Sequence, residues 1–143
     1  MKYDGITGRV INAIHSGDIE LLNVLFDCNF LEPLDMFDLT GLGRHGKSND
    51  CVTMLHIVAK KRCPDYRELI DIMLKNGVPL NYSTTQTALE DAIVYQNFPT
   101  AFYLETLGGT HSFDSPGEHS EYVIKLYNNY VAYKESLLQK AEV

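Results

Sequence analysis

The residues best suited to chemistry lie in one short segment, Gly41 to Ser48. Its sequence, GLGRHGKS, satisfies the phosphate-binding loop pattern GxxxxGK[ST]. In that loop backbone N–H groups cradle phosphates, a lysine (here Lys47) meets the terminal phosphates, and a serine (here Ser48) binds magnesium. The pattern predicts nucleotide binding if a buried strand precedes the segment and a helix follows it.

The surroundings of this segment favour a loop instead. The preceding residues, Leu34–Leu39, include two acids, whereas a strand of a parallel sheet is almost entirely apolar. The rest of the chain lacks the alternation of strands and helices that a nucleotide-binding sheet needs. Nucleotide binding through 41–48 therefore remains an alternative. The main hypothesis is a non-catalytic protein without a cofactor.

No other polar residues have the spacing of a metal or catalytic site. The histidines lack a cysteine or acid at ligand spacing. Cys28, Cys51 and Cys63 form no CxxC pair and are expected to be reduced thiols, which are typical of the cytoplasm or nucleus. The N-terminus has no apolar run of signal-peptide length, and no run approaches the ~18 residues of a membrane span. We expect an intracellular protein, cytoplasmic or nuclear, without a metal ion.

The charge of the chain limits its partners. The net charge is −7 and the sequence pI is about 5.1, so nucleic acid and anionic membranes would repel the chain as a whole. The basic cluster Lys60–Arg62 is too short for a nucleic-acid-binding stripe. With 45% apolar and 22% charged residues, the chain has the composition of a folded domain. We expect another protein or a peptide as the partner.

Apolar residues at helical spacing predict helical hairpins. Within Arg9–Phe30 two apolar groups flank Ser16-Gly17-Asp18, a helix stop followed by a helix start. The same order recurs at Thr53–Leu74 and Thr87–Leu107. No segment shows the alternation of a half-buried strand, so the predicted fold class is all-α. Residues 118–141 have a three-and-four spacing that predicts one or two further helices.

The hairpins resemble ankyrin repeats, whose unit opens with Thr-Pro-Leu-His-x-Ala. The segment Thr53–Ala59, TMLHIVA, is similar to that opening, and Gly77 corresponds to the glycine that stops the second helix. Thr87 begins a similar unit that stops at Gly108, and the first unit stops at Asn29. The resemblance covers residues 8–110 and implies a solenoid of stacked hairpins with finger loops. It also implies a structural, loop-bonding role for His56.

These units divide a single domain, 1–143, into successive parts. They are repeat 1 (about 4–30), an insert (31–50), repeat 2 (about 51–81), repeat 3 (about 82–110) and a C-terminal helical cap (about 112–141). The cap matches no complete repeat and is expected to hide the last apolar face. The insert has apolar residues from Leu34 to Leu42, which predict that it folds back as a short helix or grips a partner.

The resemblance implies an adaptor, regulator or effector that binds a partner protein on its concave face. The corresponding positions are His15, Ser16, Asn49, Asp50, Val52, Lys60, Lys61, Ser83, Thr84, Gln86, Val94 and Tyr95. Their mixture of a lysine pair, a tyrosine and small polar groups suits an acidic or mixed peptide. Four tyrosines between Tyr122 and Tyr133 leave a second possibility open, namely self-association through the C-terminal helices.

Overall fold

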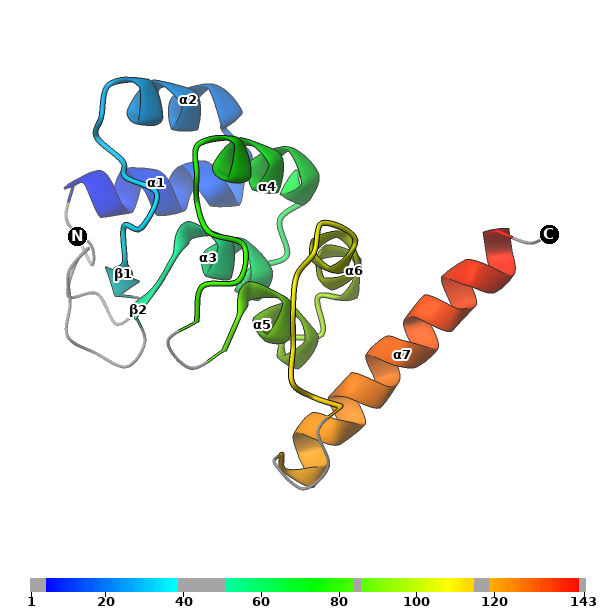
Figure 1. Ribbon diagram of the computed structural model, residues 1–143. Helices are drawn as coiled ribbons and strands as arrows, with labels where there is room; N and C mark the ends of the chain where they lie inside the picture. The colour runs from blue at the N-terminus through cyan, green and yellow to red at the C-terminus, as the bar shows by residue number, and fades with distance from the viewer. Residues whose placement is uncertain (1–4, 39–50, 84–85, 115–118, 142–143) are drawn as a thin grey trace.

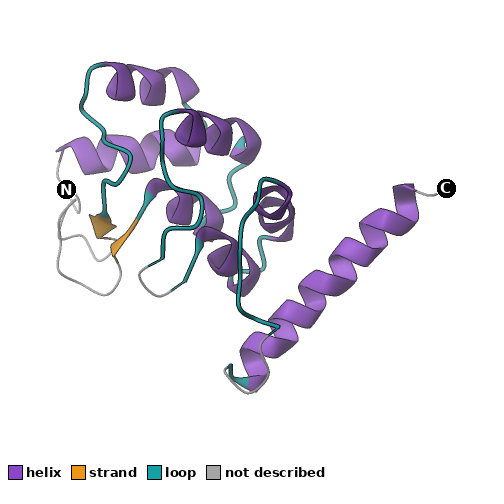
Figure 2. Ribbon diagram, in the orientation of Figure 1, coloured by secondary structure: helices purple, strands orange, loops and turns teal. Residues whose placement is uncertain are grey.

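The fold is α-helical, as the computed structural model shows (Figures 1 and 2). The structure describes residues 5–38, 51–83, 86–114 and 119–141. The helices in these ranges are α1 (Gly5–Ser16), α2 (Ile19–Asp27), α3 (Met54–Lys60), α4 (Tyr66–Lys75), α5 (Ala88–Val94), α6 (Phe98–Thr106) and α7 (Glu121–Ala141). The strands are β1 (Phe37–Asp38) and β2 (Cys51–Val52). The all-α class predicted from the sequence is confirmed.

The first six helices form three hairpins packed side by side (Figure 1). Helices α1 and α2, α3 and α4, and α5 and α6 pack as pairs. The first helices, α1, α3 and α5, contact one another in order, and α2, α4 and α6 do the same. The chain therefore forms two layers of short helices. Helix α7 packs against α5 and α6, and its C-terminal part projects from the body (Figure 1).

Local sequence signals set the helix boundaries. Between α1 and α2, Gly17 has a φ of 71°, and the Asp18 carboxylate accepts a hydrogen bond from the N–H of Leu21 at 3.1 Å. After the second helix of each hairpin, Asn29, Gly77 and Gly108 also have positive φ, at 60°, 92° and 106°. The left-handed conformation at this position ends a helix. The stops predicted from the sequence are thus found where the pattern indicated.

Polar bonds join neighbouring hairpins through their turns. Asn97, buried at the start of α6, donates from its amide to the carbonyl oxygens of Ala59 at 3.1 Å and Val58 at 3.4 Å. The Arg62 guanidinium donates to the carbonyl oxygen of Gln96 at 3.3 Å. These bonds satisfy carbonyl groups at the end of α3 and in the turn before α6. They fix the second hairpin relative to the third.

The core runs between the two layers and ends under α7. In α3 every side chain from Met54 to Ala59 is buried. At the other end the ring of Tyr130 is fully buried, and Leu126 lies one turn before it. The region predicted as one or two helices is therefore a single helix, whose N-terminal part covers the end of the core.

Residues 31–38 form no helix, contrary to one expectation for the insert. Phe37 and Asp38 pair antiparallel with Val52 and Cys51, and the side chains of Leu31 and Phe37 are buried. Leu31 and Phe37 thus pack into the core, whereas Leu34 is 54% exposed. Leu39 and Leu42 lie outside the described residues.

Candidate functional site

The opening of α3 is built around His56. The N–H of Thr53 donates to His56 Nδ1 at 3.3 Å, and the Thr53 hydroxyl lies 2.8 Å from the same nitrogen. His56 Nε2 lies 2.8 Å from the carbonyl oxygen of Gln86. Because Nδ1 accepts, the proton is assigned to Nε2, which donates to Gln86. Burial lowers the pKa of His56, so the neutral ring joins α3 to the loop before α5.

Glu90 occupies the corresponding position at the opening of α5. Its Oε1 accepts from the N–H of Thr87 at 2.8 Å, and the N–H of Glu90 bonds back to the Thr87 hydroxyl at 3.2 Å. Its Oε2 accepts from both the N–H and the hydroxyl of Ser112, each at 3.1 Å. The two openings thus use different side chains to reach the following loop.

A group of basic side chains lies at the ends of α1 and α3. His15, Lys60, Lys61 and Arg62 line one shallow hollow together with Cys63. We call these four basic residues and Tyr95 the basic face. The Lys60 ammonium lies over the Tyr95 ring, 5.6 Å from its centroid, so the end of α3 contacts the end of α5. In the described part of the chain, no carboxylate lies within ion-pair distance of Lys60, Lys61 or Arg62.

Titratable groups beside the basic face are perturbed. Partial burial lowers the pKa of His15, and the charge of Lys61 lowers it further. Burial raises the pKa of Asp91 to about 7; Lys60 opposes this shift and the neighbouring Glu90 adds to it. Asp91 is 5% exposed and occupies the position that Ile57 takes in α3. Asp91 is therefore a buried carboxyl group close to Lys60, and it does not itself line the hollow.

The structure brings some of the predicted binding residues together. His15, Lys60, Lys61 and Tyr95 contribute to the basic face. Ser16 is exposed but bonds to its own helix, from its hydroxyl to the Asn12 carbonyl at 2.8 Å. Three predicted residues, Asn49, Asp50 and Thr84, lie outside the described residues.

The remaining predicted residues lie in other environments. Ser83 is exposed and Val94 is half-buried. The backbone carbonyl of Gln86 accepts the hydrogen bond from His56. The prediction for Val52 is wrong: its side chain is 5% exposed and belongs to the core. Val52 is the β2 residue opposite Phe37, and this pairing turns both side chains inward.

Sequence reasoning missed Arg62 and Asp91. Arg62 adjoins the lysine pair, and its contact with Gln96 comes from the packing of two hairpins. Asp91 carried a signal in the sequence, because it is an acid at a helix position where the preceding repeat has isoleucine.

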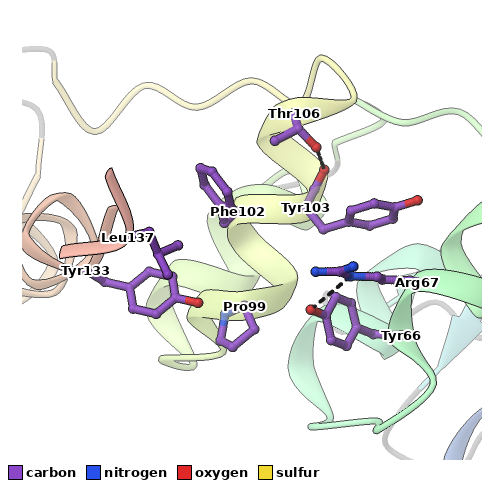
Figure 3. Close-up of a pocket in the computed structure, with 8 residues that line it drawn as sticks. All are labelled: Tyr66, Arg67, Pro99, Phe102, Tyr103, Thr106, Tyr133 and Leu137. Carbon is purple, nitrogen blue, oxygen red and sulfur yellow. Dashed lines mark hydrogen bonds between the residues drawn. The ribbon is translucent and has the colours of Figure 1, made fainter. Parts of the chain in front are cut away.

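A second hollow lies on the opposite layer of helices, among α4, α6 and α7 (Figure 3). It has a volume of about 390 Å³ and is lined by Tyr66, Arg67, Pro99, Phe102, Tyr103, Thr106, Tyr133 and Leu137. We call it the aromatic groove. The Arg67 guanidinium lies 5.8 Å from the ring centroid of Tyr66 and 5.6 Å from that of Tyr103, and its Nε donates to the Tyr66 hydroxyl at 3.3 Å.

The C-terminal tyrosines have different environments. Tyr130 is buried, and its hydroxyl donates to Glu105 Oε1 at 3.2 Å. Tyr127 and Tyr133 are partly buried against the core. Tyr122 is exposed. Three of the four rings therefore have a part in capping the core.

The phosphate-loop pattern 41–48 lies outside the described residues. The next element after this pattern is strand β2. Helix α3 begins only at Met54, several residues after Ser48. Within the described ranges, no three His, Cys, Asp or Glu side chains are grouped as metal ligands. No helix in those ranges is both long and apolar enough for a transmembrane span.

Comparison with protein-family models, with curated proteins and with solved structures finds no match for this chain.

Proposed function

We propose that this protein is a non-catalytic binding module of the ankyrin-repeat type that holds an acidic segment of another protein on its basic face. The observation that carries the proposal is the convergence of Lys60, Lys61 and Arg62, beside His15, on one hollow in a chain of net charge −7. Positive charge gathered locally on a negative protein attracts and orients an acidic partner.

The geometry of the basic face supports binding to a carboxylate-rich segment. Lys60 is steadied by the Tyr95 ring, and Arg62 is held by the Gln96 carbonyl, so both cations have a restricted position before a partner arrives. A partner then loses less conformational entropy in ordering them. Tyr95 is about half exposed and supplies apolar area beside the charges.

The repeat interpretation rests on features that recur along the chain. Three successive hairpins end in a residue with positive φ, and two of them open with a threonine followed three residues later by a side chain that bonds to the next loop. Such loop-joining bonds hold the first helices in register, which is what a continuous binding surface requires.

A matched pair of double variants tests the basic face. We expect Lys60→Gln with Tyr95→Ala to lower the recovery of bound protein from a cell extract at least tenfold. The control, Lys75→Gln with Tyr122→Ala, removes the same residue types from exposed positions elsewhere and should bind as the wild type does. The captured polypeptide is then titrated by calorimetry at several salt concentrations. Equal loss in both double variants, or an affinity independent of salt, would contradict the proposal.

A nucleotide titration separates this function from the alternative at 41–48. A ligand that binds the folded state raises the melting temperature by an amount set by its concentration relative to its dissociation constant. The binding-module proposal predicts no shift with millimolar magnesium–ATP. A saturable upward shift that Lys47→Ala abolishes would overturn the proposal in favour of a nucleotide-binding protein.

A further inference from the structure

The aromatic groove and the projecting end of α7 have complementary chemistry. The groove offers apolar contact from Phe102, Tyr133 and Leu137, with the Arg67 guanidinium at its other side (Figure 3). No carboxylate in the described residues lies within ion-pair distance of Arg67. The aromatic groove is therefore suited to an apolar side chain that has a carboxylate nearby.

The α7 helix carries such a pair on another of its faces. Leu138 is 62% exposed, although Leu137 beside it lines the groove. Consecutive residues point about 100° apart on a helix, so Leu138 faces away from the groove of its own chain. Glu135 is exposed and lies three residues earlier, and side chains at this spacing are neighbours on one helix face.

We propose that the occupant of the aromatic groove is a second copy of this chain. The α7 end of each copy lies across the groove of the other, Leu138 enters beside Phe102 and Tyr133, and Glu135 pairs with Arg67 of the other copy. The arrangement is isologous, because each chain supplies both the groove and the helix end. It closes on itself as a dimer and leaves the basic face free.

Two features favour this occupant. The α7 end projects from the body, so it can reach a neighbouring molecule without any rearrangement of the hairpins (Figure 1). Lys134 is already engaged with Glu105 at 3.0 Å and its ammonium lies over the Tyr130 ring, which anchors α7 immediately before the projecting part. The helix end is thus presented in a fixed direction, and its ordering cost on association is small.

Sedimentation velocity over a range of protein concentrations tests the proposal. We expect the wild type to shift from monomer towards dimer in the micromolar range, and Leu138→Asp to remain monomeric. Leu138 is exposed in the monomer, so this variant should melt as the wild type does. Val24→Asp, which places the same charge on an exposed apolar position of α2, is the control and should dimerise normally. A wild type that is monomeric throughout, or equal dimerisation of Leu138→Asp, would overturn the proposal.

A charge exchange tests the pairing itself. Arg67→Glu and Glu135→Arg should each weaken dimerisation by about tenfold or more, because each places like charges together. The double variant exchanges the two charges between positions 67 and 135, so opposite charges meet again and wild-type dimerisation should be recovered. Failure of the double variant to recover it, with both single variants weakened and all variants folded, would overturn this arrangement of the two chains.

Discussion

The openings of α3 and α5 have the same backbone arrangement but use different side chains, a neutral imidazole in α3 and carboxyl groups in α5. In each, a threonine precedes the helix and the side chain three residues later bonds to the following loop. In α3 that side chain is the neutral ring of His56 and the next residue is the core residue Ile57. In α5 the two positions are Glu90 and Asp91. Two adjacent carboxyl groups thus replace an imidazole and a hydrocarbon.

The difference shows that this architecture requires a bond between successive hairpins more than a particular residue. A histidine ring spans the gap with one nitrogen at each end, whereas the glutamate uses one oxygen for its own helix and the other for Ser112. The carboxylate makes charge-assisted bonds, which are stronger than neutral ones. Its proximity also disfavours ionisation of Asp91.

The largest expected effect is that of Glu90→Ala. The variant removes the acceptor of the Thr87 N–H and of both Ser112 donors, and we expect the free energy of unfolding to fall by about 3 kcal/mol. Urea unfolding measures the change. Ser112→Ala, which removes one donor, should cost about 1 kcal/mol. If Glu90→Ala costs no more than this, the loop bond contributes little to stability.

His56→Ala is expected to cost less, about 2 kcal/mol in the same assay. The bonds it removes are neutral, but the Gln86 carbonyl and the Thr53 N–H lose their partner in a buried site. If the charge-assisted bonds of Glu90 are the stronger ones, Glu90→Ala must lower the free energy of unfolding more than His56→Ala does. A larger fall for His56→Ala than for Glu90→Ala would show that the histidine opening contributes more to stability.

Asp91→Asn is expected to stabilise the protein by at least about 1 kcal/mol at pH 8 and to have almost no effect at pH 3, where the carboxyl group is protonated in both the folded and the unfolded state. The pKa of Asp91 is raised to about 7, above its usual value of 3.8. The folded state therefore binds more protons than the unfolded state between these values, and stability falls as pH rises through this window. Thermal melting at both pH values measures the effect. Asp71→Asn, at an exposed carboxylate, should show no such stabilisation at pH 8.

The smallest effect concerns the pH dependence set by His56. Burial lowers its pKa below 6.5, so on acidification the unfolded state takes up a proton first and stability falls as pH drops below about 6.5. We expect His56→Gln to flatten this part of the curve. The comparison is made in an Asp91→Asn background, where the opposing titration is absent. An unchanged slope in His56→Gln would assign the acid sensitivity to another group.

The sequence was most informative where structure depends on neighbouring residues in the chain. The stop at Gly17, the positive φ of Gly77 and Gly108 and the capping threonines of α3 and α5 all follow from local conformational preference. These signals sufficed for the three hairpins and for the all-α class.

The features missed from the sequence depend on packing between distant segments. Val52 looked like an exposed loop residue, but pairing of β2 with β1 buries it. The environment of Asp91 arises from burial together with Lys60 of the preceding hairpin. The aromatic groove combines α4, α6 and α7, which no local pattern relates. For the basic face, the sequence supplied its lysines and Tyr95, while the contact between Lys60 and Tyr95 required the structure.

The pairing of β1 with β2 also makes the chain tolerant of change in length. Asp38 and Cys51 are cross-strand partners, so the two ends of the segment 39–50 are held at adjacent points. Doubling the length of a segment closed in this way costs only about 0.6 kcal/mol of chain entropy. We therefore expect the hairpins on either side to keep their packing when a peptide epitope or a fluorescent label is inserted between residues 39 and 50. Related sequences are expected to differ in length here before they differ in length anywhere within the helices.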